Sequence, residues 1–227
     1  TEMVFHQEAF FYNNRHHKNY PNDSLLHYSL LVANNSLKVD KVCFPHDDAE
    51  ENYIFSPSLQ TFSINGDTLY YCKNFDSKVY HVTKDSIFTC YDIALPNPLP
   101  ISKINKHEDE MNLIQSDYSL GISHIYESHG LLYFRFFNGG YFWNVLYDLL
   151  ENRQICCVKA LQDNFTANVP IIDIVDGVYE GNFYSVLTPD FIDYKMNREL
   201  LNCSPVFQDY DEELDNPVIA FYEVIQP

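Results

Sequence analysis

Histidines near the N-terminus are the first residues whose side chains could do chemistry. His16 and His17 are adjacent, and His6 and His27 lie nearby in the chain. Imidazole nitrogens are common metal ligands, but the H-x-x-x-H spacing that places two of them on one helical face is missing here. We therefore interpret this segment as a solvated polar loop, and we predict no metal and no cofactor.

Two acidic clusters are the next candidates for chemistry. They comprise Asp47, Asp48, Glu50 and Glu51 in the first and Asp209, Asp211, Glu212, Glu213 and Asp215 in the second. Glycoside hydrolysis needs two carboxyl groups at a fixed separation across a cleft, and nothing in the first cluster specifies such a separation. The second cluster begins D-x-D like a calcium loop but lacks the central glycine and the glutamate at position twelve. We interpret both clusters as solvated connections.

Motifs for a nucleophile or a phosphate cradle are absent from the sequence. There is no G-x-S-x-G, no Walker-type loop and no G-x-G-x-x-G, and the chain has only 7 glycines. Trp143 lies in an aromatic run, where its ring could stack on a sugar or a peptide, but we favour packing between sheets. We predict no catalytic residue, and the binding residues stay unassigned.

The cysteines show no metal-binding spacing. They stand at positions 43, 72, 90, 156, 157 and 203. Cys72 and Cys90 fall in strand-like runs, where a small buried thiol is favoured over a disulfide. The cysteines therefore do not reveal the compartment.

Composition and charge exclude several classes of function. The chain has 227 residues, of which 46% are hydrophobic and 20% are charged, as in globular proteins. Its 14 basic and 32 acidic residues give a net charge of −18, which repels phosphate backbones and anionic membranes. No apolar run approaches the ~18 residues of a spanning helix. We expect no nucleic-acid partner and no membrane-spanning segment.

Alternating apolar residues and turn signals predict a chain made almost entirely of strands. The clearest stretch is residues 62–95, which predict about four strands in a row, with a tight hairpin turn at Asn65-Gly66-Asp67 between the first two. The same pattern returns over residues 121–161 and, more briefly, over 171–187. Further strands are expected at residues 7–13, 25–33, 37–44 and 216–225.

Two segments between the strands could be helical. Residues 101–116 are only weakly amphipathic, so a helix and a mobile loop both stay open. Thr188-Pro189-Asp190 is a helix start, because threonine can cap, proline suits the first position and aspartate favours the positive end of the dipole. Ile192, Met196 and Leu200 would continue that helix.

The strands group into units that favour a β-propeller. Aromatic strand centres at Phe11, Tyr70, Tyr133 and Phe183 recur at irregular intervals of 50 to 63 residues. Propeller blades are meanders of about four strands whose faces are buried when neighbours stack. We expect one all-β propeller domain, complete or partial, with blades near residues 1–48, 53–100, 117–162 and 170–227. A β-sandwich interaction domain is the structural rival.

Several runs also carry a resemblance to a known family. They are NGDTLYYCKNFDSKVYHVTKDSI with CYDIAL, LLYFRFF, VLYD and the ending DEELDNPVIAFYEV. These runs resemble the six-bladed β-propeller proteins of Bacteroides and related bacteria, most specifically at Asp67–Tyr80 and Asp215–Tyr222. The resemblance implies a periplasmic or cell-surface protein, secreted or lipid-anchored, in a group whose functions are mostly unassigned. It also implies that this chain is the C-terminal part of a longer propeller, or a shortened relative that closes alone or by association.

The function predicted from these patterns is that of a module rather than an enzyme. We expect a non-catalytic binding or scaffolding propeller with a protein, peptide or glycan ligand, because propeller loops gather around one end of the axis. The alternative is a carbohydrate-active hydrolase or lyase on the same scaffold. An enzyme would place two carboxylates, or a carboxylate and a histidine, together in the axial pocket.

Overall fold

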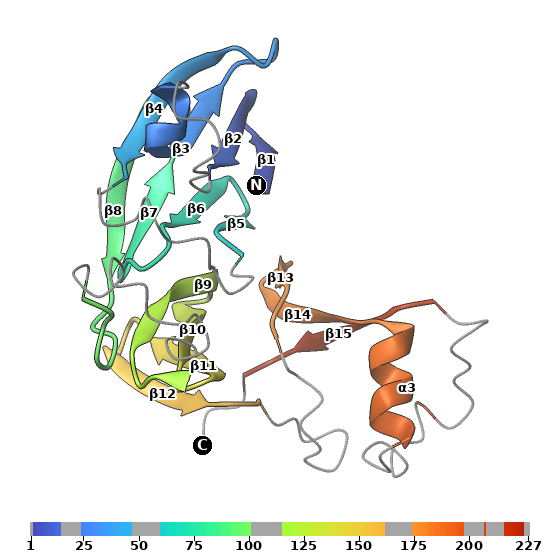
Figure 1. Cartoon of the computed structure of the whole chain (residues 1–227). Coiled ribbons are helices and arrows are strands. Elements are labelled where there is room, and N and C mark those ends of the chain that lie inside the picture. The colour runs from blue at the N-terminus through green and yellow to red at the C-terminus, as the bar shows by residue number, and fades with distance from the viewer. Residues whose placement is uncertain are drawn as a thin grey trace. The chain divides into compact units, whose positions relative to one another are not determined.

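The structure, a computed structural model, is almost entirely β. It describes residues 2–14, 24–46, 60–100, 115–161, 174–197, 207 and 216–224. These residues form three four-stranded sheets and one three-stranded sheet, all antiparallel meanders (Figure 1). The chain divides into two compact units, Thr1–Ile125 with Arg135–Phe142 and Tyr126–Phe134 with Trp143–Pro227. The predicted all-β class with four-stranded meanders is confirmed.

The first sheet lies in the first unit and has the order β1-β2-β3-β4. Its strands are β1 (Glu2–His6), β2 (Ala9–Asn13), β3 (Tyr28–Ala33) and β4 (Val39–Pro45). The strand predicted from residue 7 begins two residues later, because Gln7 and Glu8 have φ of 45° and 65° and form the β1–β2 turn. The start of the strand predicted from residue 25 lies instead on a short 3-10 helix, Ser24–His27.

The second sheet also lies in the first unit and contains the four strands predicted for residues 62–95. They are β5 (Phe62–Asn65), β6 (Thr68–Cys72), β7 (Lys78–Val82) and β8 (Ile87–Asp92). Gly66 has φ of 58° in the β5–β6 turn, as the Asn-Gly signal predicts. One face of this sheet packs on the first sheet through a core of Ala9, Phe11, Leu30, Val32, Phe62, Leu69, Tyr71 and Val82.

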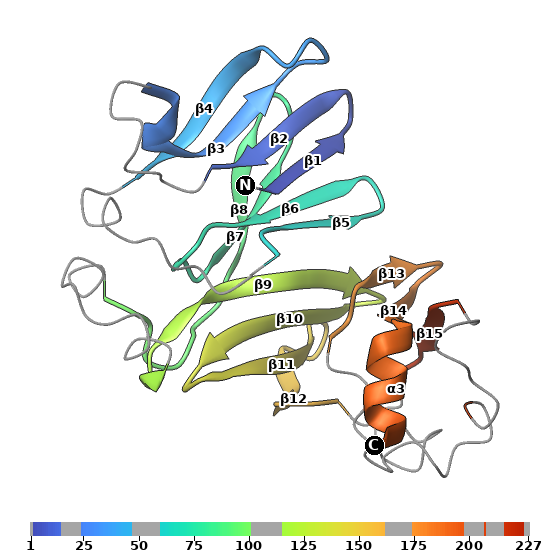
Figure 2. The same ribbon diagram turned by 45° about the vertical axis from the view of Figure 1, so that its right-hand side comes forward.

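The third sheet contains β9 (Ser119–Ser128), β10 (Leu131–Asn138), β11 (Tyr141–Asp148) and β12 (Arg153–Val158), in the order β12-β11-β10-β9 (Figure 2). It includes the three longest strands, β9, β10 and β11, and each of these three has residues in both units. Two-residue turns at His129-Gly130 and Gly139-Gly140 join the first three strands, and all four turn residues have positive φ. This is the hairpin series predicted for residues 121–161.

The fourth sheet lies in the second unit and has three strands among the described residues. They are β13 (Gly177–Tyr179), β14 (Asn182–Leu187) and β15 (Val218–Tyr222). Helix α3 (Pro189–Asn197) follows β14 and starts as predicted, with the Ile192 amide donating to the Thr188 carbonyl over 3.0 Å. β15 begins two residues after the start of the predicted strand 216–225, because Pro217 has no amide to donate to a ladder.

Other predicted elements lie wholly or partly outside the described residues. Residues 101–114 of the segment predicted as a helix or a loop are among them, as are 198–200 beyond α3 and 171–173 of the predicted unit 171–187, whose first strand was expected at 171–175. In that strand, residues 174 and 175 are not extended into a sheet. Cys72 is buried, as predicted, whereas Cys90 is half-buried and its thiol donates to the Val79 carbonyl over 3.2 Å. No helix among the described residues is long and apolar enough to cross a membrane.

Candidate functional site

Most of the sequence-predicted site candidates fall outside the described residues. His16, His17, both acidic clusters and Cys203 are in this group. Within the described ranges, no three histidine, cysteine, aspartate or glutamate side chains are grouped so that they could hold a metal ion. His6 has a structural contact, since its Nε2 donates to the Asp67 backbone carbonyl over 3.1 Å. The side-chain Nε2 of Gln7 donates to the same oxygen over 2.9 Å.

Trp143 is half-buried on β11. The ammonium of Lys159 lies 5.5 Å from the centroid of its ring, within the range of a cation–π contact. A sugar or peptide that stacked on this face of the ring would have to displace the lysine. Ligand stacking and packing between sheets both stay predictions for Trp143.

Polar side chains on the first strands of the sheets bond to the next sheet along the chain. The Glu2 carboxylate on β1 accepts hydrogen bonds from the Thr61 amide (2.9 Å), the Thr61 hydroxyl (2.6 Å) and the Phe62 amide (3.3 Å). The Ser63 hydroxyl on β5 accepts from the Ile125 amide on β9 (3.1 Å). The same kind of contact occurs within the second unit.

In the second unit, the hydroxyl of Ser128 at the end of β9 donates a hydrogen bond of 2.5 Å to the Gly181 carbonyl in the β13–β14 turn. Because each of these bonds satisfies a backbone group with a side chain from another sheet, it fixes the relative position of two neighbouring strands. The contacts of Glu2, Ser63 and Ser128 thus recur as a device that joins successive sheets.

A second group of polar side chains is buried in the first unit, at the middle of β9 and β10. Ser123 is fully buried, and His124 and Arg135 keep only 7% and 9% of their surface exposed. Nearly every residue of β9 is buried, although β9 is an edge strand of its sheet. Burial of a guanidinium and an imidazole is uncommon in an apolar sheet, so Ser123, His124 and Arg135 form the strongest candidate site among the described residues.

The backbone around His124 departs from an ordinary strand. His124 has φ of 51°, and Gly121, three residues earlier, has φ of 111°. A Cβ at Gly121 would lie 3.0 Å from the Phe75 amide nitrogen, so glycine is needed for this close approach. The next amide, that of Ile125, is held by Ser63. A left-handed histidine within a strand costs conformational energy and marks functional sites more often than ordinary ones.

Electrostatics keep the imidazole neutral. Burial, and then the positive charge of Arg135, lower the pKa of His124 to about 3. The Arg135 guanidinium carbon lies 4.4 Å above the centroid of the Phe142 ring, a cation–π geometry. At neutral pH the group therefore offers one fixed positive charge, one neutral imidazole and one hydroxyl.

Sequence reasoning missed this group, although a signal was present. In residues 121–126 and 131–137 of the predicted unit 121–161, His124 and Arg135 are the only residues with a titratable side chain other than tyrosine. Counting outward from the His129-Gly130 turn places them at similar distances along paired strands, where cross-strand neighbours meet. A search for isolated polar residues in apolar hairpins would have found them.

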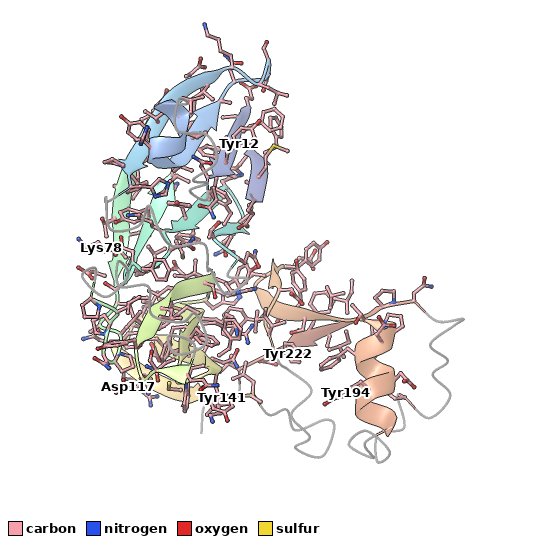
Figure 3. All side chains as sticks on the ribbon, viewed as in Figure 1. Tyr12, Lys78, Asp117, Tyr141, Tyr194 and Tyr222 are labelled. Carbon is pink, nitrogen blue, oxygen red and sulfur yellow. The ribbon has the colours of Figure 1, made fainter. Side chains whose placement is uncertain are left out.

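Two sheets each expose an apolar face. In the first sheet, Met3 and Phe5 are 53% and 55% exposed, and the Phe5 ring lies 4.8 Å from that of Phe10. Tyr12, labelled in Figure 3, continues this face, with its ring 6.4 Å from that of Phe10. We call these four residues the first-sheet face.

The fourth sheet has a comparable face in the second unit. Its members are Tyr179, Tyr184, Val186, Ile219 and Phe221, which we call the fourth-sheet face. Phe221 is 54% exposed, and its ring lies 6.2 Å from that of Tyr179 and 6.1 Å from that of Tyr184. Contiguous exposed apolar patches are typical of interaction surfaces.

Repeated antiparallel meanders that pack face to face and are joined through their first strands define a protein of the β-propeller class. A family model described as a 6-bladed beta-propeller matches residues 3–171, more than half of the chain. The chain belongs to this six-bladed β-propeller family.

A solved structure also shares the fold. It is the crystal structure of a Bacteroides fragilis protein that is described as exported, and it matches with a TM-score of 0.66 at 15% sequence identity. The match covers 97% of this chain, which spans 64% of the length of that protein. At this identity the likeness shows the fold alone. A comparison with curated proteins finds no match.

Proposed function

We propose that this chain is a non-catalytic binding or scaffolding propeller module that works outside the cytoplasm. The observation that carries the proposal is the pair of exposed apolar faces, the first-sheet face and the fourth-sheet face. The opposite face of the first sheet has the same apolar character, and its residues Phe11 and Leu30 are fully buried against the second sheet. An exposed face with the composition of a covered one is suited to receive another protein surface.

The four sheets act in this proposal as consecutive blades of one propeller domain, near residues 1–48, 53–100, 117–162 and 170–227. Blades bury their hydrophobic faces only when neighbours stack on both sides. Further sheets of the same kind are the best fit to the two exposed faces. The loops at the blade ends then hold the ligand, a protein, a peptide or a glycan.

The location outside the cytoplasm is supported by the Bacteroides fragilis structure, whose protein is described as exported. In cells that produce the protein, we expect it in the periplasmic or surface fraction. Recovery with the cytosolic fraction alone would contradict this part of the proposal.

An array of peptides and glycans, read for bound protein and for product, tests the binding function. We expect retained ligands of unchanged mass. Cleavage or elimination products would instead favour the rival function, a carbohydrate-active hydrolase or lyase. A His124→Asn variant separates the two readings further, because it removes the buried imidazole that a hydrolase could use while leaving both exposed faces intact.

A further inference from the structure

The two exposed faces lie on opposite sides of their sheets with respect to the order of stacking. The first sheet packs on the second through Phe11 and Leu30, so the first-sheet face is the side that a preceding sheet would cover. The fourth sheet packs on the third within the second unit, where the Phe183 ring lies 6.3 Å from that of Tyr133. The fourth-sheet face, on the other side of its strands, is therefore the side that a following sheet would cover. One chain thus carries both of the surfaces that form a stacking contact.

The first-sheet face is a continuous apolar surface across the paired strands. Phe5 pairs with Phe10, and Met3 pairs with Tyr12 two residues further along the same two strands. The row that starts with Met3 and Tyr12 continues through Leu31 on β3 and Val42 on β4. None of these side chains is charged, so a covering surface would not have to desolvate an ion at these positions.

The fourth-sheet face is built in a similar way. Tyr184 pairs with Gly177 on one side and with Phe221 on the other. A Cβ at Gly177 would lie 2.6 Å from the Tyr184 ring, so the missing side chain leaves the space that this ring occupies. Val186 and Ile219 form the next pair and are 41% and 56% exposed. All five members of this face are uncharged, as in the first-sheet face.

We propose that the fourth-sheet face of one copy of the chain packs on the first-sheet face of a second copy. This inference rests on the proposed function, because it takes the two faces as binding surfaces, and it specifies the partner. A second copy is the occupant because it supplies to each exposed face the kind of surface that covers the same side of a sheet within the chain. The two faces differ, so the contact is heterologous and assembly continues until a ring closes or a filament grows.

The net charge of −18 separates a second copy from a basic partner. Two copies repel each other at long range, and salt screens this repulsion, with a Debye length of about 8 Å at physiological ionic strength. Self-association should therefore become stronger as sodium chloride is added. Association that weakens with added salt would contradict the proposal, because attraction between opposite charges would then hold the partners together.

Two single variants test the head-to-tail arrangement by complementation. Phe5→Ser disables the first-sheet face and Phe221→Ser disables the fourth-sheet face, and both positions are exposed, so the fold should tolerate either change. Sedimentation equilibrium is measured for each variant alone and for an equimolar mixture. Each variant alone should associate about tenfold or more weakly than the wild type, because its one intact face finds only a disabled partner face. The mixture should form a one-to-one dimer that grows no further, because both of its remaining faces are disabled.

Leu150→Ser is the matched control, since it changes an exposed apolar residue outside both faces and should associate like the wild type. Met3→Ser and Ile219→Ser repeat the complementation with a second residue of each face. Undiminished association of either Phe5→Ser or Phe221→Ser alone would overturn the head-to-tail contact, and so would a mixture that stays monomeric. A monomeric wild-type chain that still retains ligands on the peptide and glycan array would overturn this inference but leave the proposed binding function standing.

Discussion

The second and fourth sheets are built from the same kinds of residue but differ in how many of their faces are covered. In β6 of the second sheet, Leu69 and Tyr71 belong to the core shared with the first sheet, while Tyr70 and Cys72 on the opposite face are also buried. In β15 of the fourth sheet, alternate residues are half-buried, and Ile219 and Phe221 between them are more than half exposed.

This difference shows that the amino-acid composition of a strand does not reveal whether one or both of its faces are buried. A strand buried on both faces and one buried on a single face both read here as aromatic and β-branched runs, whereas a half-exposed strand normally alternates apolar and polar residues. The fourth sheet, like the first, departs from that alternation. We infer that its open face is built to be covered, and the predictions below compare covered with exposed positions.

The largest expected effect is at a covered position of the first sheet. Phe11→Ala removes a fully buried ring from the core with the second sheet and should lower the free energy of unfolding by about 3–5 kcal/mol. Phe5→Ala, on the exposed face of the same sheet, is the matched control and should cost less than about 1 kcal/mol. Urea unfolding measures both. Equal losses would mean that the first-sheet face is covered after all.

The buried imidazole predicts a dependence of stability on pH. Because burial and Arg135 lower the pKa of His124 to about 3, the unfolded chain binds more protons than the folded one between that value and an ordinary histidine pKa. The contribution of His124 is thus complete above about pH 6.5 and is lost as pH falls toward 3. Between pH 7 and pH 5 the loss should be about 2 kcal/mol.

Urea unfolding at these two pH values checks the prediction. His124→Asn, which tolerates a positive φ, should remove most of the difference between the two pH values, whereas His27→Asn should leave it unchanged. If the wild-type stability is the same at pH 5 and pH 7, His124 is exposed to solvent and not buried.

A smaller effect is expected where a side chain joins two covered sheets. Glu2→Gln removes the charge that accepts hydrogen bonds from the Thr61 and Phe62 backbone, and should lower the free energy of unfolding by about 1–2 kcal/mol. Glu8→Gln, in the exposed β1–β2 turn, is the control and should change it little. If both variants behave alike in thermal unfolding, the Glu2 contacts do not stabilise the junction.

Much of this architecture could be predicted from local patterns. We could predict the Asn-Gly and Gly-Gly turns and the helix start at Thr188-Pro189. The backbone angles at such places depend on a few adjacent residues. Strand β1 was missed, since Gln7-Glu8 is not a usual turn pair and its positive φ values are imposed by the pairing of β1 with β2.

The candidate site was harder to predict than the fold. His124 and Arg135 are separated by a hairpin, and their burial depends on the neighbouring sheet and on the Phe75 segment, which approaches Gly121. The exposed faces could not be predicted from the sequence either, because Phe5 and Phe11 are the same residue type and differ only in burial. Such information is held in contacts between sheets, which a linear pattern does not record.

Sedimentation velocity over a range of protein concentrations tests most directly whether the exposed faces are built to be covered. We predict that the wild-type chain associates as its concentration rises. A double variant, Phe5→Ser with Phe221→Ser, should sediment as a monomer, while Leu150→Ser, which alters a lone residue 84% exposed in a turn, should associate like the wild type. A wild-type chain that stays monomeric at every concentration would contradict the account.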